Sequence, residues 1–257
     1  MGCYPLFCCQ RWDELRHDFD LLRSRLVTLT LVTDPFGSFD RADLGSSFDF
    51  VREYKHHFVA DLSRVDELPS TRNHRRNVAR ARASVEVLVA ADPKAEAGEV
   101  VPLYEALVER RGISGLRRFS AERVAQQLAV PGAFLFTASL DRETVAFLLC
   151  YLMADVAYAH LAGASERGYE LRASFALYYA ALHHFRGDAS WFVLGSTPDV
   201  ESASSRGGLA RFKRGFATDT RPSFLCGSIF DRSTYRRLGG ADTAYFPAYR
   251  TSEAAWA

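Results

Sequence analysis

The chain has 257 residues, of which 48% are hydrophobic and 25% are charged, and its formal net charge is +1. It is long enough for one large domain or a domain with an appendage, and it can bury a full core without metal or disulfides. The near-zero net charge excludes a global field that would recruit nucleic acid or an anionic membrane, so any polyanion would have to meet a local basic patch.

The cysteines, the N-terminus and the apolar runs bear on the cellular compartment. The five cysteines form no C-x-x-C motif, and their odd number argues against a secreted disulfide framework. The first residues lack the basic and apolar regions of a signal peptide, and no apolar stretch approaches the roughly 20 residues that span a bilayer. The excess of Arg over Lys and the abundant Ala fit a bacterial genome. We therefore expect a soluble, cytoplasmic, bacterial protein without membrane insertion.

The N-terminal part of the chain alternates helical and extended patterns. The patterns predict a helix at 11–23, a strand at 26–32, a short strand at 57–62 and a basic helix from about 72 to 83. Asp34-Pro35 ends the first strand, residues up to about Phe50 are expected to form a loop, and Ser70-Thr71 supplies a cap for the basic helix.

The order of elements becomes informative between Val85 and Phe230. Alternating or β-branched runs predict strands at 85–90, 133–139, 144–153, 156–162, 191–195 and 224–230. Amphipathic runs predict helices at 101–111, 120–129, 170–185 and 208–215. The turn at Asp141-Arg142-Glu143 predicts a hairpin. The resulting order is β-α-α-β-β-β-α-β-α-β.

Three local runs carry a resemblance to a known family. They are residues 57–62 (HFVADL) with 73–81 (NHRRNVARA), residues 157–165 (AYAHLAGAS) and residues 208–216 (GLARFKRGF). Together with the element order, these runs resemble the Fem-like branch of the GNAT acyltransferase superfamily, which includes the FemABX peptidoglycan-bridge aminoacyltransferases.

The resemblance implies an α+β GNAT fold, with a mixed, mostly antiparallel, splayed sheet flanked by helices. Fem enzymes carry two GNAT-like units, so residues 1–66 would be a truncated N-terminal GNAT-like subdomain and residues 67–257 the acyltransferase domain. The implied activity is N-acyl transfer to an amine by direct attack on a bound thioester or ester.

The resemblance also implies where the acyl group lies. In GNAT folds two central strands part, and the gap here would lie between residues 156–162 and 191–195, with a backbone N–H as oxyanion donor. The Phe212-Lys213 pair would lie at the site, with the Lys213 ammonium stabilising the acyl carbonyl and Phe212 and Trp191 contacting substrate. The alternative is that Lys213 simply lies on the solvated face of a short helix.

Tyr158 and His160 are two apart on one predicted strand, so their side chains are expected on one face. His160 could act as a general base and Tyr158 as a proton donor to the leaving group. A buried aromatic pair that packs on a helix is the competing interpretation.

The donor is open on sequence grounds. Acyl-CoA enzymes of the superfamily bind pyrophosphate with a Q/R-x-x-G-x-G/A loop, and residues 165–170 here (SERGYE) match only at Gly168. Arg167 and Arg172 could still contact phosphate. Acetyl-CoA is the default donor, and aminoacyl-tRNA is the rival because Fem-like relatives that use it lack the full loop.

The basic helix offers a phosphate-binding surface. Arg75 and Arg76 are the residues we expect to meet a possible tRNA or a nucleotide-linked acceptor, although such a run is often only a solvated face. His56-His57 and His183-His184 have no Cys or carboxylate at metal-ligand spacing, so no metal is expected. The acceptor would be a small-molecule or peptide amine. An inactive GNAT-like binding module is the alternative of a different class.

Overall fold

The structure, a computed structural model, describes residues 6–9, 11–115, 118–197, 207–239 and 246–250. The chain forms two compact units: unit 1 comprises residues 1–57, 196–201 and 221–257, and unit 2 comprises residues 58–195 and 202–220. Strands β3 (Phe50–Asp61) and β9 (Asp219–Ile229) contribute residues to both units. The expected division at residue 66 assigned the whole C-terminal part to the acyltransferase domain, whereas residues from Arg221 onward cluster with unit 1.

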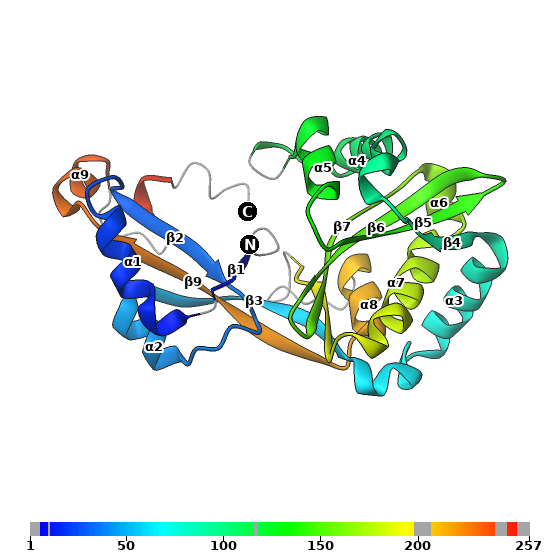
Figure 1. The fold of residues 1–257 in the computed structure, drawn as a ribbon, viewed down its shortest axis with the longest axis horizontal. Helices are drawn as coiled ribbons and strands as arrows, with labels where there is room; N and C mark the ends of the chain where they lie inside the picture. The colour runs from blue at the N-terminus through cyan, green and yellow to red at the C-terminus, as the bar shows by residue number, and fades with distance from the viewer. Residues whose placement is uncertain (1–5, 10, 116–117, 198–206, 240–245, 251–257) are drawn as a thin grey trace. The chain divides into compact units, whose positions relative to one another are not determined.

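Unit 1 is a small sheet with helices packed on it (Figure 1). Its elements are β1 (Leu6–Phe7), α1 (Leu15–Leu22), β2 (Thr28–Thr33), α2 (Arg41–Ser47), parts of β3 and β9, and α9 (Arg232–Arg237). Strand β2 pairs antiparallel with β9, and β1 pairs parallel with β2. Phe19 of α1 and Leu44 of α2 are buried in one apolar cluster with Leu31. Helix α2 replaces the expected loop, because Asp40 and Asp43 form a capping box that starts a short helix.

Unit 2 contains the larger part of the sheet. Its strands follow the order β3-β8-β7-β6-β5-β4, and those not yet given are β4 (Glu86–Val89), β5 (Ala133–Leu140), β6 (Glu143–Met153), β7 (Val156–Ala164) and β8 (Trp191–Gly195). All neighbouring pairs are antiparallel except β7 and β8. The mixed, mostly antiparallel sheet predicted from sequence is confirmed. The predicted hairpin is also present, since Asp141 and Arg142 both adopt left-handed φ angles, 52° and 69°, between β5 and β6.

Helices cover both faces of the unit 2 sheet (Figure 1). They are α3 (Arg72–Ser84), α4 (Ala97–Arg111), α5 (Ala121–Leu128), α6 (Glu166–Glu170), α7 (Ala173–His184) and α8 (Gly208–Phe216). Helices α4 and α5 pack on the face that carries Leu135 and Leu149, while Phe136 of β5 contacts Phe185, just after α7. None of the described helices is both long and apolar enough to cross a bilayer.

The predicted helix at 170–185 is wrong at its start. Helix α6 begins already at Glu166 and ends at Glu170, and α7 begins only at Ala173. Arg172 between them has a φ of 59°, a left-handed conformation that cannot continue a right-handed helix. The break separates the segment that resembles a pyrophosphate loop from the long helix behind it.

Candidate active site

Strands β7 and β8 pair over a short distance only. Their parallel register runs from Val156↔Trp191 to Tyr158↔Val193. Beyond that point β7 stays paired with β6 up to Ala164, whereas β8 stays paired with β3 up to Gly195. Within the described strands, the two neighbours therefore part after Tyr158 and Val193. Past this point the ladder between β7 and β8 does not continue within these described strands.

His160 lies in a β-bulge at this opening. Leu161 pairs with Leu149 but Ala159 pairs with Cys150, so His160 is the extra residue on β7. Its Nε2 lies 2.7 Å from Oε1 of Gln127, and its ring centroid is 5.0 Å from that of Tyr151. Burial lowers the pKa of His160 to about 4. The imidazole is therefore neutral at neutral pH, and Nε2 carries the proton if it donates to the Gln127 oxygen.

Tyr158 shares the sheet face of His160. It lies directly opposite Tyr151 in the register, and directly opposed residues point to the same face. Tyr151 donates from its hydroxyl to the Gln127 carbonyl in α5, which identifies this face as the one covered by α4 and α5. Tyr158 is only 2% exposed. The expected placement of Tyr158 and His160 on one face thus agrees with the register, despite the bulge.

Lys213 of α8 is a buried cation at the end of β8. Its residue is 8% exposed, and a Cβ built on Gly195 would lie 3.0 Å from its Nζ. Gly195 itself has a φ of 84°. The ammonium therefore lies beside the last residue of β8, two residues beyond the point where β7 and β8 stop pairing. The alternative interpretation, in which Lys213 lies on a solvated helix face, is wrong for this residue.

Phe212 and Trp191 have different surroundings. The Phe212 ring lies 4.9 Å from that of Phe175 and 5.0 Å from that of Tyr178, both on α7, so it anchors α8 to α7. Trp191 begins β8 opposite Val156 and is half-buried. Lys213 thus approaches from the α7 side of the sheet, whereas Tyr158 and His160 belong to the α4–α5 side.

Several polar groups of the segment at residues 165–170 (SERGYE), which was compared with a pyrophosphate loop, are engaged in hydrogen bonds. The Gly168 amide donates to the Oγ of Ser165 at 3.1 Å, and that hydroxyl donates to the Val145 carbonyl at 3.2 Å. A Cβ on Gly168 would lie 2.2 Å from the Val145 oxygen, so this glycine packs directly on β6. Arg167 forms an exposed ion pair with Glu170 at 2.8 Å.

Arg172 points toward α3. Its Nη1 donates to the Asn77 amide oxygen in that helix, so it is bonded away from the α6 N-terminus. Together with the engaged Gly168 amide and the Arg167–Glu170 pair, this arrangement uses one amide of the segment and holds Arg172 away from it.

The basic helix α3 presents its charge outward. Arg75 is exposed, and its Nη1 donates to the carbonyls of Pro69 and Ser70 at 3.2 and 3.1 Å. Arg76, also exposed, donates to the Asn73 amide oxygen at 3.2 Å. Among the described residues, no three His, Cys, Asp or Glu side chains are grouped as metal ligands.

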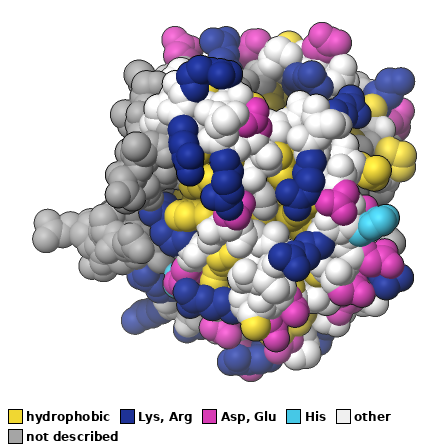
Figure 2. Space-filling model, turned by 90° about the vertical axis from the view of Figure 1, so that its left-hand side faces the viewer, with side chains coloured by type: hydrophobic (Ala, Val, Ile, Leu, Met, Phe, Trp, Pro, Cys, Tyr) yellow, Lys and Arg dark blue, Asp and Glu magenta, His cyan; other side chains and the backbone are white. Residues whose placement is uncertain are grey.

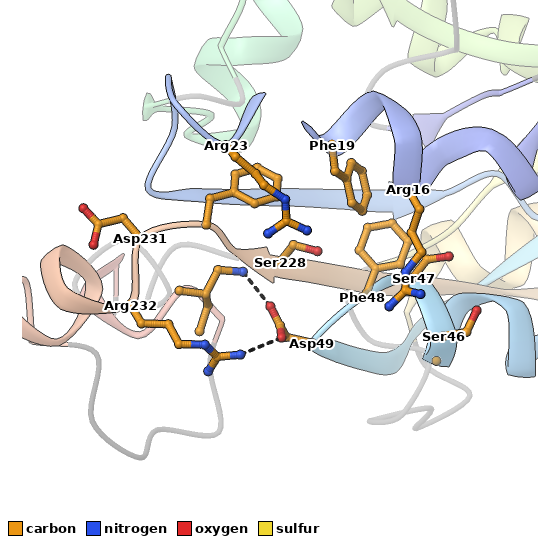
Figure 3. A pocket seen from close by; sticks show the side chains of 13 residues that line it. Arg16, Phe19, Arg23, Ser46, Ser47, Phe48, Asp49, Ser228, Asp231 and Arg232 are labelled. Carbon is orange, nitrogen blue, oxygen red and sulfur yellow. Dashed lines mark hydrogen bonds and ion pairs between the residues drawn. The ribbon is translucent and has the colours of Figure 1, made fainter. Parts of the chain in front are cut away.

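A pocket of about 810 Å³ lies in unit 1, between α1, the end of α2 and the turn from β9 to α9 (Figure 3). Arg16 of α1 and Arg23, just after that helix, line it, and Lys and Arg side chains gather on this face of the molecule (Figure 2). Its carboxylate Asp49 accepts from Arg232 at 2.9 Å and from the Ile229 amide at 2.8 Å. No residue of the predicted site lines this pocket.

The sequence profile of the acetyltransferase (GNAT) domain matches residues 70–200, about half of the chain. The chain belongs to the GNAT family. The GNAT match contains β4 to β8, and therefore the parting of β7 and β8, while Lys213 follows it in the chain. No curated protein sequence matches the chain.

Solved structures share the fold beyond the GNAT match. FemX superposes with a TM-score of 0.64 at 13% identity, over 88% of this chain and 79% of FemX. L-PGS from Bacillus licheniformis gives a TM-score of 0.60 at 17% identity, over 86% of this chain and 72% of its own. A C-terminal domain (DUF2156) assigned to a lysylphosphatidylglycerol synthetase from Agrobacterium fabrum gives 0.57 at 14% identity, over 76% of this chain and only 65% of its own length. These likenesses show a Fem-like form of the GNAT fold.

His74 is a residue that sequence reasoning missed. It lies inside the NHRRNVARA run, but its partners Phe212 and Gly215 are about 140 positions away in the chain. The local sequence pattern does not indicate these contacts. Gln127, the partner of His160, was missed as well, because a Gln pair on an amphipathic helix is typical of a solvent-exposed face.

Proposed function

We propose that this GNAT protein transfers an acyl group to an amine by direct attack, in the opening between β7 and β8. One observation carries the proposal: the buried Lys213 ammonium lies beside Gly195, where β8 has separated from β7. An opening in the sheet is what lets groups from both faces reach one carbonyl, since Lys213 comes from the α7 side and Tyr158 and His160 from the other.

The chemistry follows from these positions. A neutral acceptor amine attacks the carbonyl carbon, a C–N bond forms, and the oxygen becomes an oxyanion. The fixed charge of Lys213 and a β7 backbone N–H past Tyr158 stabilise that oxyanion, which in a dry site contributes several kcal/mol. The bond to the leaving group then breaks, the nitrogen loses a proton and the leaving group gains one. His160, which burial keeps neutral with a pKa of about 4, is the imidazole at this position that can accept the first, as a weak base. The buried Tyr158 hydroxyl can donate the second.

The donor is either a CoA thioester, as is general for GNAT domains, or an aminoacyl-tRNA ester. The Ser165 bond to the Gly168 amide favours the second candidate, because the amide that would hold a pyrophosphate is already used. The exposed arginines of α3, Arg75 and Arg76 among them, offer a surface for tRNA phosphates. A peptide or amino-sugar amine is the matching acceptor class.

A binding and turnover experiment separates the candidates. The protein is titrated with acetyl-CoA and with mixed aminoacyl-tRNA, and acylated products from amine acceptors are sought by mass spectrometry. We expect tRNA binding with turnover and no response to CoA; saturation with a CoA thioester that did bind would raise stability by about 2–4 kcal/mol. CoA binding with turnover would instead establish the first donor. Binding without any product would overturn the enzymatic proposal and leave an inactive GNAT-like binding module.

A further inference from the structure

The imidazole of His74 joins α3 to α8: one ring nitrogen bonds the N-cap of its own helix, and the other bonds the backbone of α8. The residue is 3% exposed. Its Nδ1 lies 2.7 Å from the Oγ1 of Thr71, and its Nε2 lies 3.2 Å from the carbonyl oxygen of Phe212. Phe212 immediately precedes Lys213, so the contact reaches the backbone next to the buried ammonium.

The partners of His74 fix its tautomer. The Phe212 carbonyl can only accept, so Nε2 carries the proton and donates. The Nδ1 lone pair then accepts from the Thr71 hydroxyl, whose oxygen accepts in turn from the His74 amide at 3.2 Å as the cap of α3. Burial also lowers the pKa of His74, which favours this neutral form. Both nitrogens are satisfied in a single orientation of the ring.

Gly215 holds the other side of the same contact. A Cβ added to Gly215 would lie 2.2 Å from the His74 ring, so the imidazole lies directly on this glycine. The Gly215 carbonyl accepts from the Ser70 amide at 2.9 Å. The start of α3 and the residue Ser70 before it therefore contact α8 at Phe212, one residue before Lys213, and at Gly215, two residues after it.

We propose that His74 is a positioning residue for Lys213, which holds α8 so that the ammonium lies at the end of β8 beside Gly195. The inference about position stands on the contacts of His74; its consequence for catalysis rests on the proposed function. A helix held only by aromatic packing can slide or rotate, because ring contacts are weakly directional. The hydrogen bond to the Phe212 carbonyl and the ring on Gly215 fix the rotation and translation of α8, which sets where Nζ lies.

The test compares three variants. His74→Phe keeps an aromatic ring in the cluster but removes both hydrogen bonds, and His74→Gln can restore a donor to the Phe212 carbonyl. Phe175→Leu is the packing control: the Phe175 ring packs on both His74 (5.4 Å) and Phe212 (4.9 Å) but makes no hydrogen bond to α8, and leucine keeps an apolar side chain there. The main readout needs no substrate: the rate at which an amine-reactive reagent modifies Lys213 at fixed pH, measured by mass spectrometry with thermal unfolding in parallel.

We expect Lys213 to be modified several-fold faster in His74→Phe than in the wild type, and near the wild-type rate in His74→Gln and Phe175→Leu. Transfer in His74→Phe should fall by about 100-fold in kcat with little change in KM, the loss that a displacement of about 1 Å can cause. Should His74→Phe fail to fold, Gly215→Ala, which pushes the ring away, replaces it with the same expected increase in labelling.

The outcomes are distinct. An unchanged Lys213 labelling rate in a folded His74→Phe, or an equal increase in Phe175→Leu, overturns the positioning role. Faster labelling with unchanged transfer keeps the positioning role and removes Lys213 from the mechanism, which is a failure of the proposed function alone.

Discussion

Nζ of Lys213 lies 3.0 Å from where the Cβ of residue 195 would be if Gly195 carried one. The positive φ of 84° favours glycine at this position, and a Cβ there would crowd the ammonium beside it. The end of β8 and the Lys213 side chain of α8 therefore lie in contact distance. A side chain added at Gly195 would displace the ammonium while residue 213 itself stays lysine.

Gly195→Ala should lower both stability and activity. The left-handed backbone costs a residue with a Cβ roughly 1–2 kcal/mol, and the added methyl pushes Nζ away from the strand end. Gly132→Ala is the control, since Gly132 has a φ of 80° and open space around its Cβ position. Chemical denaturation should show similar losses in both variants, whereas transfer should fall in Gly195→Ala only. Equal transfer activity in Gly195→Ala and Gly132→Ala would show that the position of the Lys213 ammonium does not affect the reaction.

Lys213→Met should fold and lose transfer. Methionine keeps most of the side-chain volume and removes a buried charge, so stability is expected to hold or rise. The lost oxyanion stabilisation should cost about 100-fold or more in kcat. Arg214→Met, at the exposed neighbour, serves as the control and should keep its activity. Steady-state kinetics of both variants decide the matter, and full activity of Lys213→Met would end the catalytic assignment.

His160 should make stability fall in acid. Its folded pKa of about 4 lies below the ordinary value of 6.5, so the unfolded chain binds more protons between these pH values. The stability that this group contributes is present above pH 6.5 and is lost as the pH falls toward 4. We expect the unfolding free energy of the wild type to drop more steeply over that window than that of His160→Gln. Parallel curves for the two proteins would contradict the lowered pKa.

The same value shapes the pH–rate profile. If His160 accepts the proton of the acceptor amine, the inflection of the pH–rate profile that His160 causes should lie near pH 4 and not near 6.5. Rates of the wild type and of His160→Ala are compared from pH 4 to 8. A profile of unchanged shape and height in His160→Ala would exclude His160 as the base.

Gly168→Ala should destabilise the fold whatever the donor. Its Cβ would lie 2.2 Å from the Val145 oxygen, a backbone atom that cannot give way, and overpacking of this kind costs about 1–3 kcal/mol. Gly187→Ala is the control, because no atom lies within 4 Å of its Cβ position. Thermal unfolding of both variants measures the difference. A Gly168→Ala protein as stable as the control would show that β6 does not constrain this glycine.

Local pattern determined much of the fold. Alternation along residues 133–162 predicted β5, β6 and β7 and the hairpin between the first two, because a strand with one covered face repeats every two residues. Local pattern did not predict α2, because a helix of seven residues shows too little periodicity. It also did not predict the break before α7, because nothing about an arginine in the sequence indicates that Arg172 adopts a left-handed φ. The pairing of β9 with β2 was not predicted either, since no local pattern indicates which strand β9 will pair with.

By itself, the sequence predicted the order of strands and helices from β4 to β9, apart from the break before α7, and its Fem-like runs imply where an acyl group is expected. Only the tertiary structure decided that β7 and β8 part after Tyr158, that Lys213 is buried at the end of β8, and that Ser165 uses the Gly168 amide. The reason is physical: periodicity and capping act over a few residues, whereas the contacts of His74 with Phe212 and of Lys213 with Gly195 join segments that meet only when the chain has folded.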